Sequence, residues 1–408
     1  MEEKHLTRAI LIGADTGEYD AESSMDELSE LAKTAGAEEL ARVLQKREAY
    51  EPATVIGEGK LAEVKELCGS LGAELLIFDC ELTASQIRNV EDETDVRVID
   101  RTMLILDIFA GRAVSREGKL QVELAQLKYR LPRLMGIGAS LSRLGGGIGT
   151  RGPGETQLET DRRHIRRRID KLSAELKELE ERRGYARDRR KKDSVQVGAI
   201  VGYTNAGKST LLNLLTGADV LAEDKLFATL DPTSRAIELP DGRSLLLVDT
   251  VGLIRRLPHH LVEAFKSTLE EAAFADVIVK VADAGDAQAA EQLAVTDEVL
   301  GSLDCADIPQ LVVYNKCDTA NTVAFDPDIL LTSAKTGYGL PALLAKLDEV
   351  LNHRVRTIEI VLPYDKLALA DILRSRGSVA AEEYRENGVY YRGTVKIDDL
   401  HRFEEFLV

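Results

Sequence analysis

The sequence predicts an α/β protein whose main domain is a doubly wound sheet built around a phosphate-binding loop. Residues 202–209 fit the pattern G-x-x-x-x-G-K-[ST] between a β-branched run and a helix-like run, which is the context of a P-loop. Strand-like and helix-like runs alternate on both sides of this loop. From residue 120 the leucines change to heptad spacing, which is typical of paired helices.

These patterns divide the 408 residues into four predicted parts. Residues 1–113 form an N-terminal α/β domain, and residues 114–193 form a coiled-coil-like, antiparallel helical hairpin with a glycine-rich tip. Residues 194–354 form the nucleotide-binding domain that contains the P-loop, and residues 355–408 form a small α+β C-terminal domain.

The composition excludes several classes of protein. The N-terminus is charged and no stretch approaches about 18 uninterrupted apolar residues, so we expect a cytoplasmic protein without stable membrane insertion; a membrane-associated fraction is left open. The net charge of −17 argues against a DNA partner or a nucleic acid bound along the whole surface, so a contact with RNA must be local. The four cysteines have no metal-ligand spacing and are interpreted as reduced thiols.

The N-terminal domain is expected to contain a parallel sheet, because strand-like and helix-like runs alternate along it. The strands are expected at residues 9–12, 54–56, 75–78 and 96–99. Residues 57–60 combine two glycines with a lysine at a strand-to-helix junction. We interpret them as a tight turn, and a phosphate site is the less favoured alternative because the P-loop spacing is missing.

Two heptad patterns predict the helices of the hairpin. The first consists of Leu120, Leu124, Leu127, Leu131 and Leu134, and the second of Ile165, Ile169, Leu172, Leu176 and Leu179. A glycine-rich segment at residues 136–154 joins the two helices. Its many glycines leave the backbone free to approach another surface closely.

The second helix is basic within an acidic protein. Residues 155–192 contain 14 Lys and Arg and nine Asp and Glu, an excess of five positive charges. The basic residues form two clusters, Arg162, Arg163, Arg166, Arg167 and Arg168, then Arg187, Arg189, Arg190, Lys191 and Lys192. We interpret these clusters as contacts to RNA phosphates. The alternative is a solvated coiled-coil face, which mixed charge usually indicates.

The P-loop predicts a cradle for the phosphates of a nucleotide. Its glycines let backbone N–H groups point inward, Lys208 supplies a positive charge to the terminal phosphates, and the Ser209 hydroxyl can ligate Mg²⁺. The nucleotide-binding residues of this loop are Gly202, Tyr203, Thr204, Asn205, Ala206, Gly207, Lys208, Ser209 and Thr210. A glycine turn with a solvated lysine is the alternative, and the flanking strand and helix argue against it.

Two further segments predict contacts with Mg²⁺ and the γ-phosphate. A buried strand ends in Asp249-Thr250-Val251-Gly252, where Asp249 can hold Mg²⁺ through a water and the Gly252 N–H can meet the γ-phosphate. Residues 225–233 mix polar and apolar side chains without periodicity, which indicates a switch loop. Thr229 or Thr233 can supply a further oxygen to Mg²⁺. The nucleotide-contacting residues of the loop are Phe227, Ala228, Thr229, Leu230 and Asp231.

Two motifs near the end of this domain predict recognition of guanine. Residues 315–318 read Asn-Lys-Cys-Asp after a buried strand, and the Asp318 carboxylate can accept hydrogen bonds from guanine N1–H and the 2-amino group, which adenine cannot supply. Residues 333–335 can present a backbone N–H to guanine O6. The base-binding residues are therefore Asn315, Lys316, Cys317, Asp318, Ser333, Ala334 and Lys335, and GTP is favoured over ATP.

The C-terminal domain shows no catalytic constellation. A strand is expected at residues 357–362, a helix at 366–376 and a hairpin turn at Asn387-Gly388. A closing helix is expected at residues 398–406.

Several of these motifs resemble the HflX family of GTPases: GYTNAGKSTLLN at 202–213, FATLDPT at 227–233, DTVGL at 249–253, NKCD at 315–318 and SAK at 333–335. GGGIGTRGPGETQLETDRR at 145–163 is more specific to that family. The resemblance implies a P-loop GTPase that binds the 50S ribosomal subunit and its ribosomal RNA and splits stalled or idle 70S ribosomes. It implies that the tip at 143–154 reaches toward the peptidyl-transferase centre.

The resemblance also implies roles for individual residues. Thr229 rather than Thr233 becomes the switch threonine, so Ser209 and Thr229 ligate the metal, and catalysis rests on Lys208, Thr229 and Gly252. Leu253 stands where Ras-like proteins have a water-orienting glutamine, so we expect hydrolysis to be slow without the ribosome.

Three alternatives remain open at this stage. Asn205 is at the position that binds K⁺ in cation-dependent relatives, and a loop-shaping Asn bonded to backbone is an equal possibility. The protein could instead be a GTP-dependent regulatory switch for a non-ribosomal protein or membrane partner, with the basic helix as a solvated scaffold. An ATP-dependent activity on RNA in the N-terminal domain is disfavoured because no second P-loop is present.

Overall fold

The computed structural model describes residues 6–141, 153–192, 195–217, 226–227, 230–256, 261, 269–319, 329–352 and 355–408. The chain forms two compact units, and each is described by itself. The first comprises Met1–Glu178, Glu223–Asp231 and Arg255–Lys266, and the second comprises Leu179–Ala222, Pro232–Ile254 and Ser267–Val408.

The first unit contains a four-stranded parallel sheet, called here the N-terminal sheet, with the strand order β2-β1-β3-β4. Its strands are β1 (Thr7–Asp15), β2 (Ala37–Lys46), β3 (Leu75–Phe78) and β4 (Arg97–Asp100). Its helices are α1 (Ala21–Thr34), α2 (Glu58–Leu71), α3 (Ala84–Thr94) and α4 (Arg101–Arg112). Residues 9–12 of β1 are fully buried, so the middle strand carries the core, and the predicted parallel α/β arrangement is confirmed.

The expected strand at residues 54–56 is wrong. Val55 is buried, but its φ of +70° is not that of a strand, and it forms only an isolated bridge with Glu51. The strand that precedes β3 is β2, which pairs in parallel with β1. Because β2 lies at the edge of the sheet and is only partly buried, its sequence AEELARVLQK is polar enough to resemble a helix. At the junction that follows, the Gly57 N–H donates to the Gln45 side chain at 2.9 Å.

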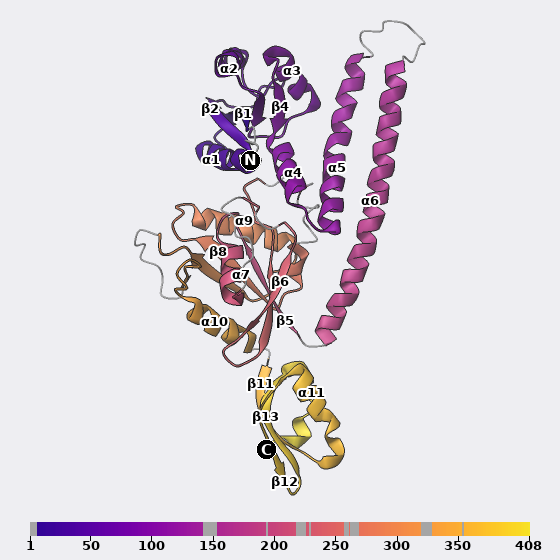
Figure 1. Cartoon of the computed structure of the whole chain (residues 1–408), viewed down its shortest axis with the longest axis vertical. Coiled ribbons are helices and arrows are strands. Elements are labelled where there is room, and N and C mark those ends of the chain that lie inside the picture. The colour runs from indigo at the N-terminus through magenta and orange to yellow at the C-terminus, as the bar shows by residue number, and fades with distance from the viewer. Residues whose placement is uncertain are drawn as a thin grey trace, which may run out of the picture. The chain divides into compact units, whose positions relative to one another are not determined.

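Helices α5 (Arg116–Leu141) and α6 (Pro153–Lys192) run antiparallel, as the heptads predict (Figure 1). Arg116 forms an ion pair with Glu175 at 3.4 Å, and Glu123 accepts two hydrogen bonds of 2.7 Å from Arg168. The two contacts lie seven residues apart on each helix, and the residue numbers rise along α5 as they fall along α6, as an antiparallel pair requires. Of the predicted tip at 143–154, residues 143–152 lie outside the described part of the chain.

Helix α5 has a second apolar stripe that the heptad pattern conceals. Val122, Ala125 and Tyr129 are buried, with spacings of three and four residues, and α5 packs on α3 and α4. The Tyr129 hydroxyl donates to the buried Asp100 carboxylate, and Arg133 donates to the Leu82 carbonyl oxygen at 2.8 Å. These contacts attach α5 to the N-terminal sheet.

The second unit contains a six-stranded sheet with the order β10-β9-β8-β5-β7-β6, parallel except for β6. Its strands are β5 (Gln196–Gly202), β6 (Thr233–Glu238), β7 (Ser244–Asp249), β8 (Val277–Asp283), β9 (Gln310–Asn315) and β10 (Leu330–Leu331). Helices α7 (Lys208–Thr216) and α10 (Leu340–Asn352) share one apolar core with β5, β7 and β8. Helix α9 (Ala289–Ser302) contacts β8 and β5 outside that core. The predicted doubly wound sheet is confirmed.

The last residues of the second unit form a three-stranded antiparallel sheet with the order β11-β13-β12. The strands are β11 (Val355–Leu362), β12 (Ser378–Arg385) and β13 (Gly388–Lys396), with a 3₁₀ turn (Tyr364–Lys366) and helix α11 (Ala368–Arg376) between β11 and β12. The strand, helix and hairpin expected here are confirmed.

The expected closing helix at 398–406 is wrong. The chain forms only the short helix α12 (Ile397–Leu400) and a 3₁₀ turn (Glu404–Phe406). Between them, Phe403 turns into the core and is fully buried. The end of the chain then pairs with β11, where the Val408 N–H donates to the Glu359 carbonyl oxygen at 2.9 Å. No helix in the described part of the chain is both long and apolar enough to span a membrane.

Candidate nucleotide-binding site

The P-loop connects β5 to α7 at the point where the sheet reverses its strand order. Strand β5 lies between β7 and β8, and the carboxyl end of such a strand is where α/β sheets bind ligands. A Cβ atom on Gly202 would lie 2.2 Å from the Val281 carbonyl oxygen, and one on Gly207 would lie 2.3 Å from Nδ2 of Asn315. Neither position has room for a side chain, which explains why the sequence has glycine at both.

Lys208 is held at the P-loop by the loop itself. Its side chain is buried, and Nζ donates hydrogen bonds to the carbonyl oxygens of Gly202 at 3.0 Å and Tyr203 at 2.8 Å. Burial lowers the pKa of Lys208 to about 8, and the negative charge of Asp249 opposes this shift. The amine is thus positioned by two backbone contacts, and its protonation responds to added negative charge.

Asn205 lies in the middle of the loop with φ of +61°, a left-handed conformation that Asn tolerates better than most residues. Its side chain is exposed and forms no hydrogen bond with the residues that the structure describes. Ala206 is buried, and Thr210 is half-buried in the first turn of α7.

Ser209 and Asp249 form an oxygen pair that fits a magnesium ion. The Ser209 hydroxyl donates to Oδ2 of Asp249 at 2.7 Å, and Asp249 is buried at the end of β7. Hydroxyl and carboxylate oxygens are the ligand types that Mg²⁺ prefers. Thr250 is directed away from this pair, because its hydroxyl donates to the Ile200 carbonyl oxygen at 2.8 Å.

The segment after β7 packs directly on the P-loop. The Thr204 N–H donates to the Leu253 carbonyl oxygen at 2.8 Å, and the Leu253 N–H donates to the Gly202 carbonyl oxygen at 3.1 Å. A Cβ atom on Gly252 would lie 2.7 Å from Cγ2 of Thr204 and 3.1 Å from Nζ of Lys208. Val251 and Leu253 are buried on either side of this glycine. A side chain therefore does not fit here without a shift of its neighbours.

Asn315 links the P-loop to the two segments that the sequence predicts to recognise the base. Its Nδ2 donates to the Ala206 carbonyl oxygen at 3.0 Å, and its Oδ1 accepts from the Ala334 N–H at 2.9 Å. The side chain is 1% exposed, so these bonds form away from water. The Thr332 hydroxyl lies 3.4 Å from the same Oδ1. One buried amide therefore fixes three loops relative to one another.

Asp318 is exposed, and its carboxylate is oriented by Ser333. The Ser333 hydroxyl donates to Oδ1 of Asp318 at 2.6 Å, which lowers the pKa of this carboxyl. Asp318 therefore stays charged and can accept hydrogen bonds from a base. Lys335 is exposed next to Ala334, whose N–H is already used by Asn315.

Lys316 and Cys317 lie between Asn315 and Asp318 in the predicted base-recognition segment. Lys316 has φ of +61°, and its Nζ lies 2.8 Å from Oδ2 of Asp283. The Cys317 N–H donates to the Thr332 carbonyl oxygen at 3.1 Å, and burial raises the pKa of its thiol. The sequence reading did not select Asp283 or Thr332. The available signal was their position: Asp283 ends the buried strand β8 and Thr332 follows the partly buried strand β10, at the same edge of the sheet as the P-loop.

The predicted switch loop is only partly described. Ala228 and Thr229 lie outside the described residues, so the choice of Thr229 over Thr233 as a metal ligand remains a prediction. Phe227 belongs to the first unit, where its ring packs edge-on against Phe109 with 4.5 Å between centroids.

Asp231 also has its contacts within the first unit. Its Oδ2 accepts hydrogen bonds from the N–H groups of Val114 at 2.9 Å and Ser115 at 2.8 Å, next to the start of α5. Leu230 is buried. The predicted nucleotide contacts of Phe227, Leu230 and Asp231 are not tested by these observations.

A glycine-rich loop at the switch point of a doubly wound sheet, beside an Asn-Lys-x-Asp segment, is the arrangement of P-loop GTPases, and the second unit has this fold. Three family models match successive parts of the chain. They are described as GTP-binding GTPase N-terminal at residues 22–110, GTP-binding GTPase Middle Region at 112–190 and 50S ribosome-binding GTPase at 197–316.

Among the relatives, GTPase HflX of Caldanaerobacter subterraneus subsp. tengcongensis is 50% identical, with 98% of this chain and 94% of that protein covered. GTPase HflX of Escherichia coli is 44% identical, with 89% and 87% covered. A solved GTP-binding protein from Sulfolobus solfataricus in complex with GDP is 26% identical, with 85% of this chain and 99% of that chain covered and a TM-score of 0.46. The chain belongs to the HflX family and is a GTP hydrolase, as the motifs indicate.

Proposed function

We propose that this GTPase binds the 50S ribosomal subunit through the α5–α6 hairpin and uses GTP binding and hydrolysis to split stalled or idle 70S ribosomes. The observation that carries the proposal is a row of exposed arginines on α6. Arg163, Arg166 and Arg167 are exposed and form no ion pair with the described residues. Such a basic row on a chain with a net charge of −17 suits a local contact with RNA phosphates.

The other two arginines of the first cluster have partners on the protein. Arg168 donates two hydrogen bonds to Glu123 of α5, and Arg162 lies 3.3 Å from Glu159. Bidentate pairing fixes the guanidinium group of Arg168 in place. We therefore assign the phosphate contacts to Arg163, Arg166 and Arg167, and we assign Arg168 to holding the hairpin together.

The nucleotide site supports GTP as the ligand. We assign the phosphates to the P-loop N–H groups and Lys208, the γ-phosphate also to Gly252, and the guanine to Asp318. Ser209 and Asp249 would hold Mg²⁺, with Thr229 as a further ligand, and the ion would neutralise charge on the phosphates. Lys208 and Gly252 act on the terminal phosphate as charge accumulates there.

The environment of Leu253 favours slow hydrolysis by the protein alone. Its side chain is buried and apolar, so it does not orient an attacking water. We propose that the ribosome, or a monovalent cation beside Asn205, supplies what is missing. K⁺ is the candidate cation, because the exposed Asn205 amide oxygen is available as a ligand.

Sedimentation with 50S subunits in a non-hydrolysable GTP analogue tests the docking. Replacing Arg163, Arg166 and Arg167 by Gln should weaken binding and reduce the salt dependence of log K by up to about three, roughly one for each phosphate contact. Arg168→Gln is the matched control, because this guanidinium is already bound by Glu123. It should leave the salt dependence nearly unchanged, and neither variant should alter GTP affinity.

Two results would contradict this assignment. An equal loss in the triple variant and in Arg168→Gln would mean that the hairpin's shape, and not its exposed charge, matters. No 50S binding by the wild-type protein would favour a GTP-dependent switch for another partner.

Splitting is tested separately by light scattering of 70S ribosomes. Deleting residues 145–152 should abolish splitting while much of the docking remains, and normal splitting by that variant would exclude the tip as the acting element.

A further inference from the structure

Strands β8 and β9 of the second unit end side by side. Asp283 is the last residue of β8, and it pairs in register with Asn315, the last residue of β9. One step further on, the Ala284 N–H donates to the Asn315 carbonyl oxygen at 2.7 Å. Asp283 therefore lies at the carboxyl edge of the sheet, where the predicted base-recognition segment begins. The nucleotide assignment above gives this carboxylate no role.

Asp283 binds the ammonium group of Lys316. Its Oδ2 lies 2.8 Å from Nζ of Lys316, and its Oδ1 accepts a hydrogen bond from the Gly285 N–H at 2.9 Å. The two side chains are only 22% and 31% exposed, so the ion pair is partly shielded from water. Because one carboxylate oxygen is fixed by the backbone, the other is oriented toward the lysine.

The backbone of Lys316 is fixed as well. Its φ of +61° is a left-handed conformation that is disfavoured for residues other than glycine. Its carbonyl oxygen accepts hydrogen bonds from the N–H of Thr319 at 3.0 Å and from the Thr319 hydroxyl at 2.9 Å. Both ends of the Lys316 side chain are thus held, which leaves its four-carbon stem little freedom.

The stem of Lys316 lies beside the P-loop. A Cβ atom on Gly207 would lie 3.9 Å from Cε of Lys316. Asp318, the predicted base-reading residue, follows Lys316 by two positions. A nucleotide with its phosphates in the P-loop and its base at Asp318 would therefore pass this stem, whose methylene groups offer an apolar surface to the ribose and the base.

Charge alone gives Asp283 no favourable effect on the nucleotide. A carboxylate at this edge repels an anionic ligand, and it also neutralises the nearby ammonium of Lys316. If the carboxylate acted only through its field, the site would bind GTP more tightly without it. A benefit from Asp283 can therefore arise only from where it holds Lys316.

We propose that Asp283 is a positioning residue for the nucleotide. It keeps the ammonium of Lys316 turned away from the ligand and the stem of Lys316 in place beside the ribose and the base. Asp283 itself does not contact the nucleotide. The inference rests on the proposed assignment of guanine to Asp318.

The test is the affinity of full-length Asp283→Asn for GDP and for a non-hydrolysable GTP analogue. The amide keeps an acceptor for the Gly285 N–H and removes the charge that binds Lys316. Both nucleotides should bind about fivefold more weakly or worse, with faster dissociation, whereas the field of the charge alone predicts tighter binding. Asp297→Asn is the matched control, because it removes the 2.7 Å ion pair with Lys280 of the same strand. It should leave both affinities unchanged.

Two further measurements separate positioning from a general loss of structure. Inorganic tripolyphosphate, which has no ribose or base, should displace a fluorescent nucleotide equally well from Asp283→Asn and from the wild type. Lys316→Met keeps most of the stem and loses the ammonium, so it should reproduce the loss and covers the case in which Asp283→Asn does not fold. Adding Asp283→Asn to Lys316→Met should weaken binding no further, because both remove the same contact.

Three results would overturn the proposal. They are unchanged or tighter nucleotide binding by a folded Asp283→Asn protein, an equal loss for tripolyphosphate, and additive losses in the double variant. None of them affects the nucleotide assignment. That assignment would instead be refuted by a wild-type protein that does not prefer GTP to ATP.

Discussion

Lys208 should give GTP binding a pH dependence near pH 8. Burial lowers its pKa to about 8, and two loop carbonyls hold its amine at the P-loop. The phosphates of bound GTP are negatively charged and favour the protonated amine. Binding therefore takes up the proton that Lys208 has lost at higher pH, and the affinity should fall as the pH rises through 8.

The size of the effect follows from this pKa. With a pKa of about 8, the protonated fraction falls from about 0.9 at pH 7 to about 0.1 at pH 9. If only the protonated form binds the triphosphate, the association constant falls about tenfold over this range. Competition titrations with a fluorescent nucleotide measure it. Calorimetry in buffers of different ionisation enthalpy should show proton uptake approaching about one per GTP at pH 9.

Lys208→Arg is the matched control, because a guanidinium stays charged throughout this range. Its affinity should be weaker than that of the wild type and independent of pH between 7 and 9. A wild-type affinity that is constant over this range would refute the reasoning. An equal decline in the Arg variant would assign the titration to the nucleotide or to another residue.

Protein stability provides an independent check on the same pKa. A lowered lysine pKa means that the folded state disfavours the charged amine, so the destabilisation is complete below about pH 8 and is relieved as the pH rises toward 10.5. The shift corresponds to at most about 3 kcal/mol. Lys208→Met should therefore melt at a higher temperature than the wild type at pH 7, and the difference should shrink toward pH 10.

Three further predictions concern the site. Asp318→Asn should weaken GTP binding and improve binding of xanthosine triphosphate, because the amide offers a donor where guanine needs an acceptor; unchanged selectivity in nucleotide titrations argues against Asp318 as the base-reading residue. Gly252→Ala should weaken binding of a GTP analogue by about 1–3 kcal/mol and binding of GDP by less, because the added Cβ would lie 2.7 Å from Thr204 Cγ2. Equal losses for both nucleotides would mean that Gly252 does not contact the γ-phosphate. Phosphate release by the protein alone should be slow in NaCl and faster in KCl or with 50S subunits, and rapid turnover in NaCl alone would mean that another residue orients the water.

The nucleotide-binding domain could be read from the sequence because its chemistry is local. A P-loop needs glycines at fixed spacing, and the structure gives the reason at Gly202 and Gly207, where any Cβ would collide with a neighbour. Asp249 and Asn315 could be found because each ends a strongly apolar strand. At these positions the sequence motif follows directly on an apolar strand, so the same residues predict both the strand and the candidate site at its end.

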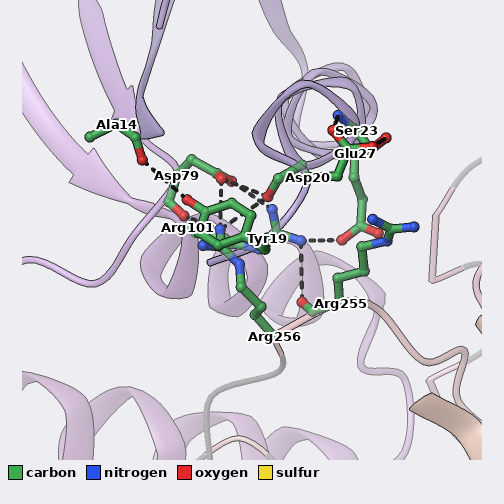
Figure 2. A network of polar contacts seen from close by, with 10 residues as sticks. Ala14, Tyr19, Asp20, Ser23, Glu27, Asp79, Arg101, Arg255 and Arg256 are labelled. Carbon is green, nitrogen blue, oxygen red and sulfur yellow. Dashed lines mark hydrogen bonds and ion pairs between the residues drawn. The ribbon is translucent and has the colours of Figure 1, made fainter. Parts of the chain in front are cut away.

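The missed features depend on contacts between segments far apart in the sequence. Strand β2 is polar because it is an edge strand, and no local pattern distinguishes it from a helix. The buried stripe at Val122, Ala125 and Tyr129 is hidden by the leucine heptads on the same helix. Arg256 looks like an ordinary charged residue after the Gly252 motif. Its guanidinium group lies 2.6 Å from Oδ2 of Asp79, a contact that becomes visible only once the N-terminal sheet is folded (Figure 2).

The position of Asn315 has a consequence for the residence time of the nucleotide. Its buried amide donates a hydrogen bond to the Ala206 carbonyl oxygen and accepts one from the Ala334 N–H, so one side chain connects the P-loop to the loop at residues 333–335. Neither loop can move far from the other while both hydrogen bonds are formed. We therefore expect release of the nucleotide to be one cooperative event, in which both ends of the ligand are freed together.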